Sequence, residues 1–432
     1  MSVPALHRLP LRGADLVLVG MQSLWGEPEP SHNTLLAVEC DGPLEPERIR
    51  RALDRFLDFC PWPASRLRRP FPWGRLSWVA GTRDALALPP VTHCSVASRE
   101  EVHRYLETEL NTAIDPKRQA PIRFLVAGNV LVLTWFHPLM DPRGGQNLLG
   151  HLSWLDEHDG RPAWNGVTPC FVPAPDTRPL RERGRLARRS VEYMATLAPV
   201  PPVSPGSGLA SPGRARFRQQ SFREDAASGN GTRATREICW RLAVVGKAMS
   251  ELWDRRRLPD VPFLVPISVD LRGKGDPGPT FGNSLAFHFA RFTPSQTADV
   301  PALAMALRHQ MADAVRDGQI EANAVAMEFL TYRPRWMMLR ALPWTADRET
   351  FSFNCADIAD FPPAVPTVFG RRVVNAYHAP AVLPRPGIGV FFNRCATRTN
   401  VVVSWVEGAA SEDEVTRIMA LIAEEMTWTR LA

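Results

Sequence analysis

The sequence of 432 residues predicts an α/β fold in two halves of comparable size. Stretches with apolar residues three and four positions apart, which is the helical period, alternate with apolar runs of strand length. This mixture occurs on both sides of a segment rich in proline, arginine, serine and glycine. A chain of this length fits two domains better than one. We therefore expect an N-terminal domain at residues 1–170, an interdomain crossover at residues 171–217 and a C-terminal domain at residues 218–432.

In the first half, residues 45–60 predict an amphipathic helix, because apolar side chains recur at helical spacing behind a proline that the first turn tolerates. Residues 102–110 predict a second helix. Two apolar runs follow, at residues 122–126 and 130–136, and the Ala-Gly-Asn sequence between them predicts a β-hairpin. Residues 148–155 return to the helical period.

Within the crossover, residues 199–213 contain almost nothing that could pack, so we expect them to be exposed. The arginine-rich residues 181–194 could form a solvated helix. In the second half, helical patterns occur at residues 238–252 and 303–315, and a third follows the capping-box pair Ser411 and Glu414. Strand-like runs occur at residues 263–270, 284–292, 351–355, 372–377, 388–393 and 401–406.

The composition excludes several classes of protein. The net charge of +6 favours anionic partners but does not choose among them, and since no nucleic-acid reader motif is recognisable we expect no nucleic-acid partner. The 7 cysteines are far apart and form no C-x-x-C pair, which argues against a disulfide framework and a zinc site. No apolar window is long enough to span a bilayer, and no signal peptide is apparent, so we expect a cytoplasmic protein.

The sequence contains two H-x-x-x-D strings. His309 and Asp313 lie inside a predicted helix, where such a pair makes a weak surface interaction. His137 and Asp141 instead lie where a buried-looking strand ends and a helix is about to begin. A histidine at this place can project into a cleft between domains, and the aspartate can turn back to brace the loop. The alternative is an ordinary histidine at a strand end followed by a helix-capping aspartate, and the local sequence leaves both open.

The segment around His137, W-F-H-P-L-M-D-P-R-G-G, resembles the H-x-x-x-D-G loop of CoA-dependent acyltransferases and of peptide-synthetase condensation domains. Gly144 and Gly145 in this loop let the backbone turn tightly or approach a ligand closely. Three further segments are similar to elements of this superfamily and appear in its order, so that the resemblance covers nearly the whole chain. They are residues 265–272 followed by residues 281–285, residues 351–354, and residues 387–392 with residues 400–405.

The resemblance implies a fold of two chloramphenicol-acetyltransferase-like subdomains, each a mixed sheet flanked by helices, with a tunnel at their interface. The sequence departs from the family pattern at two positions of the loop. Phe136 stands where condensation domains usually carry a second histidine, and Pro142 stands where glycine usually follows the aspartate. The D-F-G-W-G signature of the plant enzymes is missing as well. These departures leave the subfamily open.

The resemblance also implies a mechanism. His137 would act as the general base that takes a proton from an alcohol or amine as it attacks a thioester carbonyl, without a covalent acyl-enzyme. Asp141, with Gly144 and Gly145, would support the site by structure, and Arg272 is the position that matches the family's partner of the aspartate. Possible oxyanion or substrate contacts are Asn283, Ser352 and Asn354, each of which also has an ordinary structural explanation.

These expectations define the partners. The chain would bind no metal and no resident cofactor, would take acyl-CoA or an acyl carrier protein as co-substrate and a small-molecule acceptor, and would be a monomer. The basic segment 178–189, which includes Arg185, Arg188 and Arg189, could steer the anionic donor, or most of its arginines could form a solvated face. Two rival functions are amide formation on carrier-protein substrates and a binding module that keeps the fold without turnover.

Overall fold

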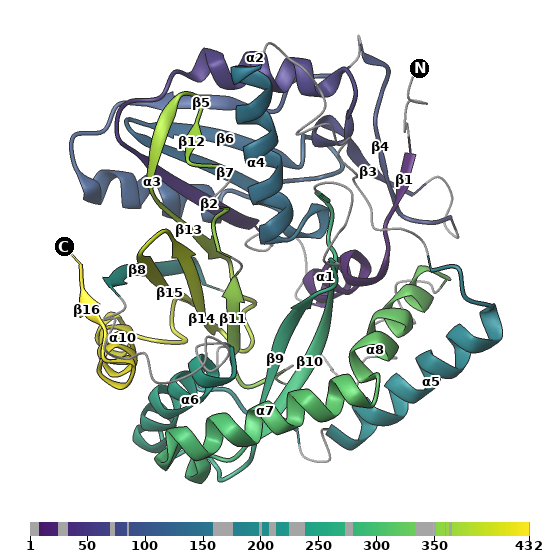
Figure 1. Ribbon diagram of the computed structural model, residues 1–432, viewed down its shortest axis with the longest axis vertical. Helices are drawn as coiled ribbons and strands as arrows, with labels where there is room; N and C mark the ends of the chain where they lie inside the picture. The colour runs from purple at the N-terminus through teal and green to yellow at the C-terminus, as the bar shows by residue number, and fades with distance from the viewer. Residues whose placement is uncertain are drawn as a thin grey trace.

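Two mixed sheets of the computed structural model pack against each other through a shared apolar layer, and helices cover their outer faces (Figure 1). The fold therefore contains the two sheets that the sequence predicts. The structure describes residues 8–24, 33–69, 74–83, 86–158, 176–197, 201–206, 213–223, 238–272, 280–332, 349, 351–358, 360–362 and 365–431.

The first sheet has six strands in the order β12–β13–β2–β7–β6–β5. The predicted hairpin is confirmed, because β6 pairs antiparallel with β7 and Gly128 takes a positive φ of 62° at the turn between them. The strands β5 and β6 run parallel, and the other neighbours are antiparallel. The bounds are β2 (Asn33–Cys40), β5 (Val91–Cys94), β6 (Ile122–Ala127), β7 (Val130–Phe136), β12 (Thr367–Val368) and β13 (Arg371–Pro380).

Both faces of this sheet are buried. Leu36 and Val38 of β2 belong to the core beneath α2 and α4, whereas Leu35 and Ala37 face the layer shared with α3 and the second sheet. Burial on two faces explains the continuous apolar runs that the sequence shows in place of an alternating pattern. The covering helices are α2 (Pro46–Leu57), α3 (Arg99–Asn111) and α4 (Pro142–Glu157).

The second sheet has the order β11–β14–β15–β8–β16 and is covered by α6 and α10. The predicted capping box of α10 is present, since the Ser411 hydroxyl accepts from the Glu414 N–H and the Glu414 carboxylate accepts from the Ser411 N–H. The predicted strand at residues 351–355 begins later, at Asn354. The bounds are β8 (Ala215–Arg223), β11 (Asn354–Ile358), β14 (Ile388–Cys395), β15 (Arg398–Val406), β16 (Thr429–Arg430), α6 (Ile238–Arg255) and α10 (Glu412–Met426).

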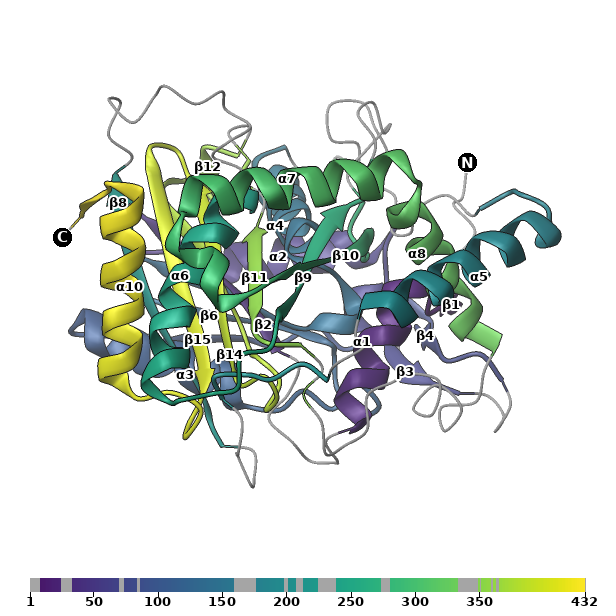
Figure 2. The same cartoon turned by 90° about the horizontal axis from the view of Figure 1, so that it is seen from below.

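A long hairpin, β9 (Phe263–Asp270) with β10 (Leu285–Phe292), forms a separate two-stranded sheet beside the second half. Figure 2 shows α6 and α10 near one end of the molecule and α8 with α5 near the other. The remaining elements are α1 (Gly13–Leu24), α5 (Leu180–Leu197), α7 (Val300–Arg316) and α8 (Gln319–Glu328), the short strands β1 (Arg8–Pro10), β3 (Arg66–Arg68) and β4 (Ser77–Val79), and the 3-10 helices η1 (Trp62–Ala64), η3 (His137–Leu139), η6 (Pro294–Ala298) and η7 (Phe329–Tyr332).

The sheets are not divided at the expected domain boundary. β13 comes from the second half of the chain, yet it pairs antiparallel with β2 and extends the first sheet. β8 begins inside the expected crossover and pairs with β15. The assignment of residues 1–170, 171–217 and 218–432 to separate structural units stays a prediction, and the strand exchange shows that the two halves do not build their sheets independently.

The crossover is also less exposed than expected. The Ser204 hydroxyl is fully buried and donates to the Pro386 carbonyl at 2.6 Å. A Cβ at Gly206 would lie 2.3 Å from the same carbonyl oxygen. The expectation of an exposed stretch is therefore wrong for residues 204–206, because this short piece packs against the loop before β14. The arginine-rich helix is confirmed as α5, whereas residues 198–200 and 207–212 lie outside the described residues.

Candidate functional site

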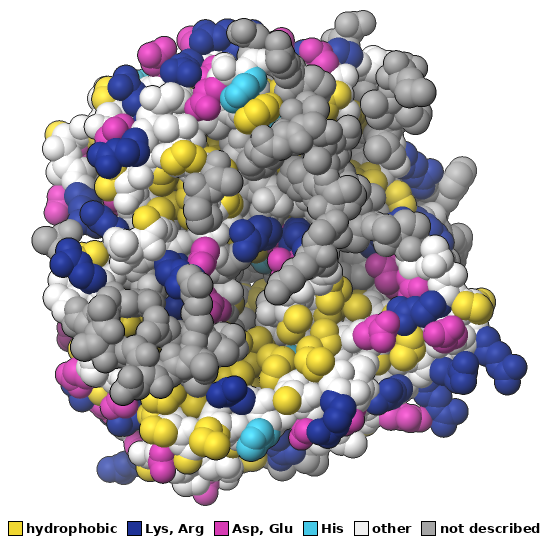
Figure 3. Space-filling model, viewed as in Figure 1, with side chains coloured by type: hydrophobic (Ala, Val, Ile, Leu, Met, Phe, Trp, Pro, Cys, Tyr) yellow, Lys and Arg dark blue, Asp and Glu magenta, His cyan; other side chains and the backbone are white. Residues whose placement is uncertain are grey.

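His137 follows directly on β7 and begins η3, so the end of a buried strand fixes its backbone. Its side chain lines a cavity of about 380 Å³. Figure 3 shows this face of the molecule hollowed near its centre, where hydrophobic and basic side chains gather. Both halves of the chain contribute to the walls of the cavity, and α1 is one of the contributing elements of the first half. The lining residues include Met21, Arg143, Ser268, Phe287, Asn354 and Phe391.

Burial lowers the pKa of His137 below its ordinary value, against the opposing effects of nearby backbone groups and of the Asp141 charge. The imidazole is therefore neutral at neutral pH. A neutral imidazole has a nitrogen lone pair that can accept a proton, so the group is in the state that a general base requires.

Asp141 caps the N-terminus of α4. Its Oδ1 accepts from the Gly144 N–H at 2.8 Å, and its Oδ2 accepts from the Ser284 N–H at 2.9 Å. The first bond closes the turn after His137. The second ties this turn to the start of β10, in the second half of the chain.

Arg272 completes the surroundings of Asp141. Its Nη2 donates to Oδ1 at 2.9 Å and its Nη1 to Oδ2 at 3.0 Å, a forked geometry between nearly buried side chains. Burial lowers the pKa of Arg272, but the charge and hydrogen bonds of Asp141 outweigh this effect and raise the pKa above its ordinary value. The pairing that the resemblance implied is therefore present.

Pro142 and the glycines after it belong to the first turns of α4, not to a loop. Proline suits the first position of a helix because its fixed φ is already helical, so Pro142 in place of glycine leaves the turn intact. A Cβ at Gly144 would lie 1.9 Å from the Phe281 carbonyl oxygen, and one at Gly145 would lie 2.9 Å from the Trp135 ring. Protein atoms therefore fill the place of a side chain at both glycines.

Two of the three expected oxyanion donors lie elsewhere. Asn283 donates its amide hydrogens to the Asp15 carboxylate and to the His137 carbonyl. Ser352 is fully buried, and its Oγ accepts from the Leu264 N–H at 3.1 Å, which is a contact to β9. Neither side chain lines the cavity of His137, so the donor role of both stays a prediction. Asn354 does line that cavity and remains a candidate.

Sequence reasoning did not single out Arg143 or the aromatic wall of the cavity. The Arg143 Nη1 donates to the Asp360 carbonyl at 3.3 Å, and burial is the main cause that lowers its pKa. Among the described residues no carboxylate lies within ion-pair distance of this guanidinium. Arg143 could have been identified from its position in the motif, two residues after Asp141. Phe287 and Phe289 stand at alternate positions of β10 and therefore share one face of the strand. This pattern indicates a face that lines a cavity or a core.

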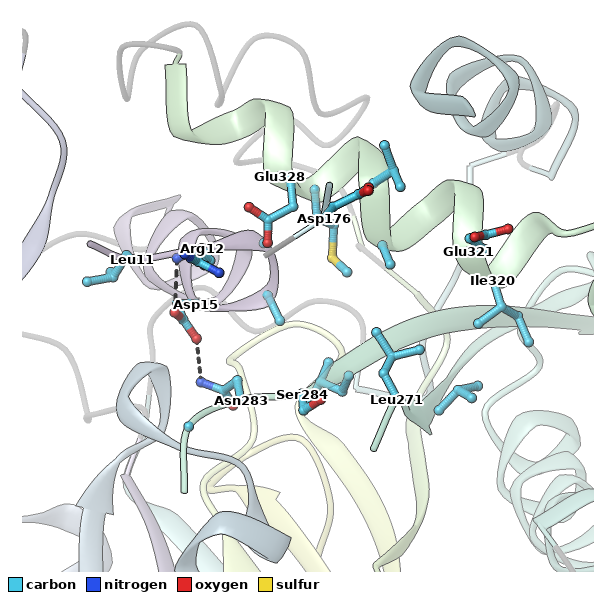
Figure 4. Close-up of a pocket in the computed structure, with 18 of the residues that line it drawn as sticks. Leu11, Arg12, Asp15, Asp176, Leu271, Asn283, Ser284, Ile320, Glu321 and Glu328 are labelled. Carbon is cyan, nitrogen blue, oxygen red and sulfur yellow. Dashed lines mark hydrogen bonds between the residues drawn. The ribbon is translucent and has the colours of Figure 1, made fainter. Parts of the chain in front are cut away.

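A second cavity of about 740 Å³ lies along α1, between η3 and α8. Figure 4 shows Asp15 of α1 pointing toward Asn283, with Glu328 of α8 nearby. Burial raises the pKa of Asp15 to about 7, and burial also raises that of Glu328. The two cavities share Ser284 and Leu285 in their walls.

Of the basic segment 178–189, Arg178 and Arg183 line the second cavity, whereas Arg185, Arg188 and Arg189 line neither cavity. Arg185 is exposed on α5, Arg188 pairs with Glu192 at 2.8 Å on the same helix, and Arg189 donates to the Asp317 carbonyl. These contacts favour a structural or solvated role over donor steering. Among the described residues, no group of three or more metal-ligating side chains occurs, and no helix is long and apolar enough to cross a membrane.

No family model matches the sequence, and no curated protein matches it. The structure is similar to the first condensation domain of the calcium-dependent antibiotic synthetase, with a TM-score of 0.68 and 14% identity over 98% of this chain and 99% of that one. It is also similar to polyketide synthase associated protein 5 from Mycobacterium tuberculosis, with a TM-score of 0.64 and 15% identity over 96% and 97% of the two chains.

A third similar structure is the starter condensation domain of the rhizomide synthetase RzmA, with a TM-score of 0.60 and 11% identity over 97% of this chain and 96% of that one. These three similarities cover nearly the whole chain. At such low sequence identity they are similarities of fold. The two sheets, the cavity between the halves and these likenesses together show that the chain has the chloramphenicol-acetyltransferase-like fold of condensation domains and CoA-dependent acyltransferases.

Proposed function

We propose that the protein is an acyltransferase that moves an acyl group from a thioester, acyl-CoA in the first instance, to an alcohol or amine. The observation that carries this proposal is the position of His137: a neutral imidazole at a strand end, in a cavity whose opposite wall comes from the second half of the chain. Donor and acceptor that meet in such a cavity need no covalent acyl-enzyme, because positioning supplies much of the rate acceleration.

In the proposed reaction, His137 takes the proton of the acceptor O–H or N–H while the acceptor oxygen or nitrogen bonds to the thioester carbonyl carbon. The carbonyl oxygen becomes an oxyanion, for which Asn354 and backbone N–H groups are the candidate donors. Collapse of this intermediate breaks the carbon–sulfur bond, and the leaving thiolate takes the proton back from the imidazolium. The products are the ester or amide and a free thiol, and the imidazole returns to its neutral state.

The similar structures support two kinds of acyl donor, acyl-CoA and an acylated carrier protein. One structure of a doubly substituted RzmA starter condensation domain contains C8-CoA and Leu-SNAC. The same chemistry here would join an acyl-CoA to an amine. The second candidate is amide formation on carrier-protein substrates, which condensation domains of synthetases represent. A small-molecule acceptor, the absence of a resident cofactor, a monomeric state and a cytoplasmic location belong to the same proposal.

The test is incubation of the protein with acyl-CoAs of increasing chain length and a panel of alcohols and amines, followed by mass spectrometry of the products. Acylated carrier proteins provide the second donor arm. We expect a product with the wild type and a loss of at least about 100-fold in rate with His137→Ala. His309→Ala, in the other H-x-x-x-D string, is the matched control and should retain the rate. No product with either class of donor would favour a binding module.

The pH dependence provides a separate prediction. Only neutral His137 can act as a base, so kcat/KM should fall as the pH falls through the pKa of this group. Because burial lowers that pKa, the midpoint of the acidic limb should lie below the ordinary value of 6.5. A pH–rate profile of the wild type would measure it, and a midpoint above pH 6.5 would contradict the assignment of His137 as the base.

A further inference from the structure

We propose that Asp15 is a positioning residue, which acts through the Asn283 side chain on the backbone turn from which His137 projects. The proposal rests on the proposed role of His137 as the base. It concerns the place where α1 packs against η3.

A chain of hydrogen bonds connects the three residues. The Asn283 Nδ2 donates to Asp15 Oδ1 at 2.7 Å and to the His137 carbonyl oxygen at 3.3 Å. The Arg12 N–H donates to Asp15 Oδ2 at 3.0 Å, so both carboxylate oxygens have a partner. Figure 4 shows the first and last of these contacts, with Asp15 between Arg12 and Asn283.

The carboxylate determines which way the Asn283 amide faces. Both oxygens of Asp15 accept, Oδ1 from the Asn283 Nδ2 and Oδ2 from the Arg12 N–H, whereas an amide donates from one end and accepts at the other. Asn283 must therefore turn its NH₂ group toward Asp15, and the second hydrogen of that group is then available for the His137 carbonyl. A reversed amide would place its oxygen against two acceptors. Asp15 thus selects the one orientation in which Asn283 holds the turn.

The electrostatics of Asp15 agree with a role in the site. Burial is the main cause that raises the pKa of Asp15 to about 7; the charges of Glu328 and Asp141 act in the same direction, and the bonds from the Arg12 N–H and Asn283 act against it. Among the described residues Asp15 forms no ion pair. A carboxyl that is desolvated without an ion pair costs folding free energy, and such groups are concentrated at functional sites.

The test needs no known substrate. The imidazole of His137 is titrated by NMR of histidine-labelled protein, and its signal is identified by its absence from His137→Ala. Because burial is the largest cause of the lowered pKa, a loosened turn should expose the ring and move the pKa toward 6.5. We expect a rise of about half a unit in Asp15→Ala and in Asn283→Ala.

Two further variants sharpen the result. The double variant should show no larger shift than either single variant, because both remove the same chain of contacts. Asp15→Asn retains an oxygen that can accept from Asn283 and should stay closer to the wild type than to Asp15→Ala. Glu328→Gln is the matched control, since Glu328 lines the same cavity as Asp15 but forms no hydrogen bond with Asp15, Asn283 or the His137 carbonyl. The pKa of His137 should not change in this variant.

A lower melting temperature in Asp15→Ala with an unchanged pKa of His137 would overturn the proposal, as would additive shifts in the double variant. Once a substrate is known, kcat should fall by on the order of tenfold in Asp15→Ala with little change in KM, because the base and not the binding wall is displaced. The titration is read without turnover, so its outcome is separate from that of the proposed function.

Discussion

Asp141 accepts four hydrogen bonds from three partners, and this makes it the residue on which the geometry of the turn depends. The partners are Gly144 at the start of α4, Ser284 before β10, and the forked guanidinium of Arg272. They come from both halves of the chain. The same carboxylate therefore closes the turn after His137 and ties that turn to the opposite wall of the cavity.

We predict that Asp141→Ala and Arg272→Ala each lower the free energy of unfolding by about 3–5 kcal/mol, because each breaks the buried pair. In Asp141→Ala, Arg272 keeps its contact with Asp270 at 3.1 Å, but the Asp270 side chain is far more exposed than that of Asp141. Urea denaturation followed by tryptophan fluorescence would measure this loss. Arg188→Ala is the control: it removes an arginine from an exposed pair with Glu192 and should change the stability by less than about 0.5 kcal/mol. Equal stability of all the variants and the wild type would show that the buried pair does not contribute.

At the scale of elements, the approach of α4 to the segment before β10 sets the distance between the two halves beside the site. Gly144 allows this approach, because the Phe281 carbonyl occupies the place of a Cβ. Phe281 in turn packs in the core of the first half, among Phe56 and Trp62. The start of α4 is therefore held by a close backbone contact on one side and by the Asp141 cap on the other.

We predict that Gly144→Ala destabilises the protein by about 1–3 kcal/mol, although alanine favours a helix, since the added methyl forces α4 and the Phe281 backbone apart. Gly184→Ala on α5 is the matched control, because a Cβ there meets no atom within 4 Å. That variant should be stabilised by up to about 1 kcal/mol. Chemical denaturation of both variants would compare them, and equal effects of the two substitutions would contradict the close contact at Gly144.

At the scale of the whole molecule, the two halves are joined by more than a crossover. β13 completes the first sheet from the second half of the chain, and the apolar layer between the sheets contains Leu35 and Val132 on one side with Phe217 and Val402 on the other. Loss of either half would expose this layer, and loss of the second half would also leave the edge of β2 without its partner strand.

We therefore predict that the protein unfolds in a single cooperative transition. Differential scanning calorimetry should show one peak, with a calorimetric enthalpy close to the van't Hoff enthalpy. Two resolved peaks would mean that the halves are stable separately, as the sequence-based division into domains suggests. Asp141→Ala should shift the whole peak to a lower temperature and should not split it, because it removes a contact between parts that unfold together.

Part of this protein can be predicted from its sequence, because local patterns carry that part. The hairpin of β6 and β7, the helix α2, the capping box of α10 and the strand β9 follow from period, turn residues and caps close together in the chain. The motif at His137 and its resemblance to a family also predicted the fold and the pairing of Asp141 with Arg272. That pairing was inferred from the order of the similar segments in the family and not from the spacing of the two residues along the chain.

Other parts depended on contacts that no local pattern contains. β2 was missed although it lies in the middle of the first sheet, since its continuous apolar run is confined to residues 35–38 and is shorter than that of β7. The exchange of β13 between halves joins positions more than 300 residues apart. Asn283 was expected to face a substrate, but the Asp15 carboxylate, on a helix that was not predicted, determines where its amide points. Such choices are made by the partner that tertiary packing brings within hydrogen-bond distance, so only the folded chain could decide them.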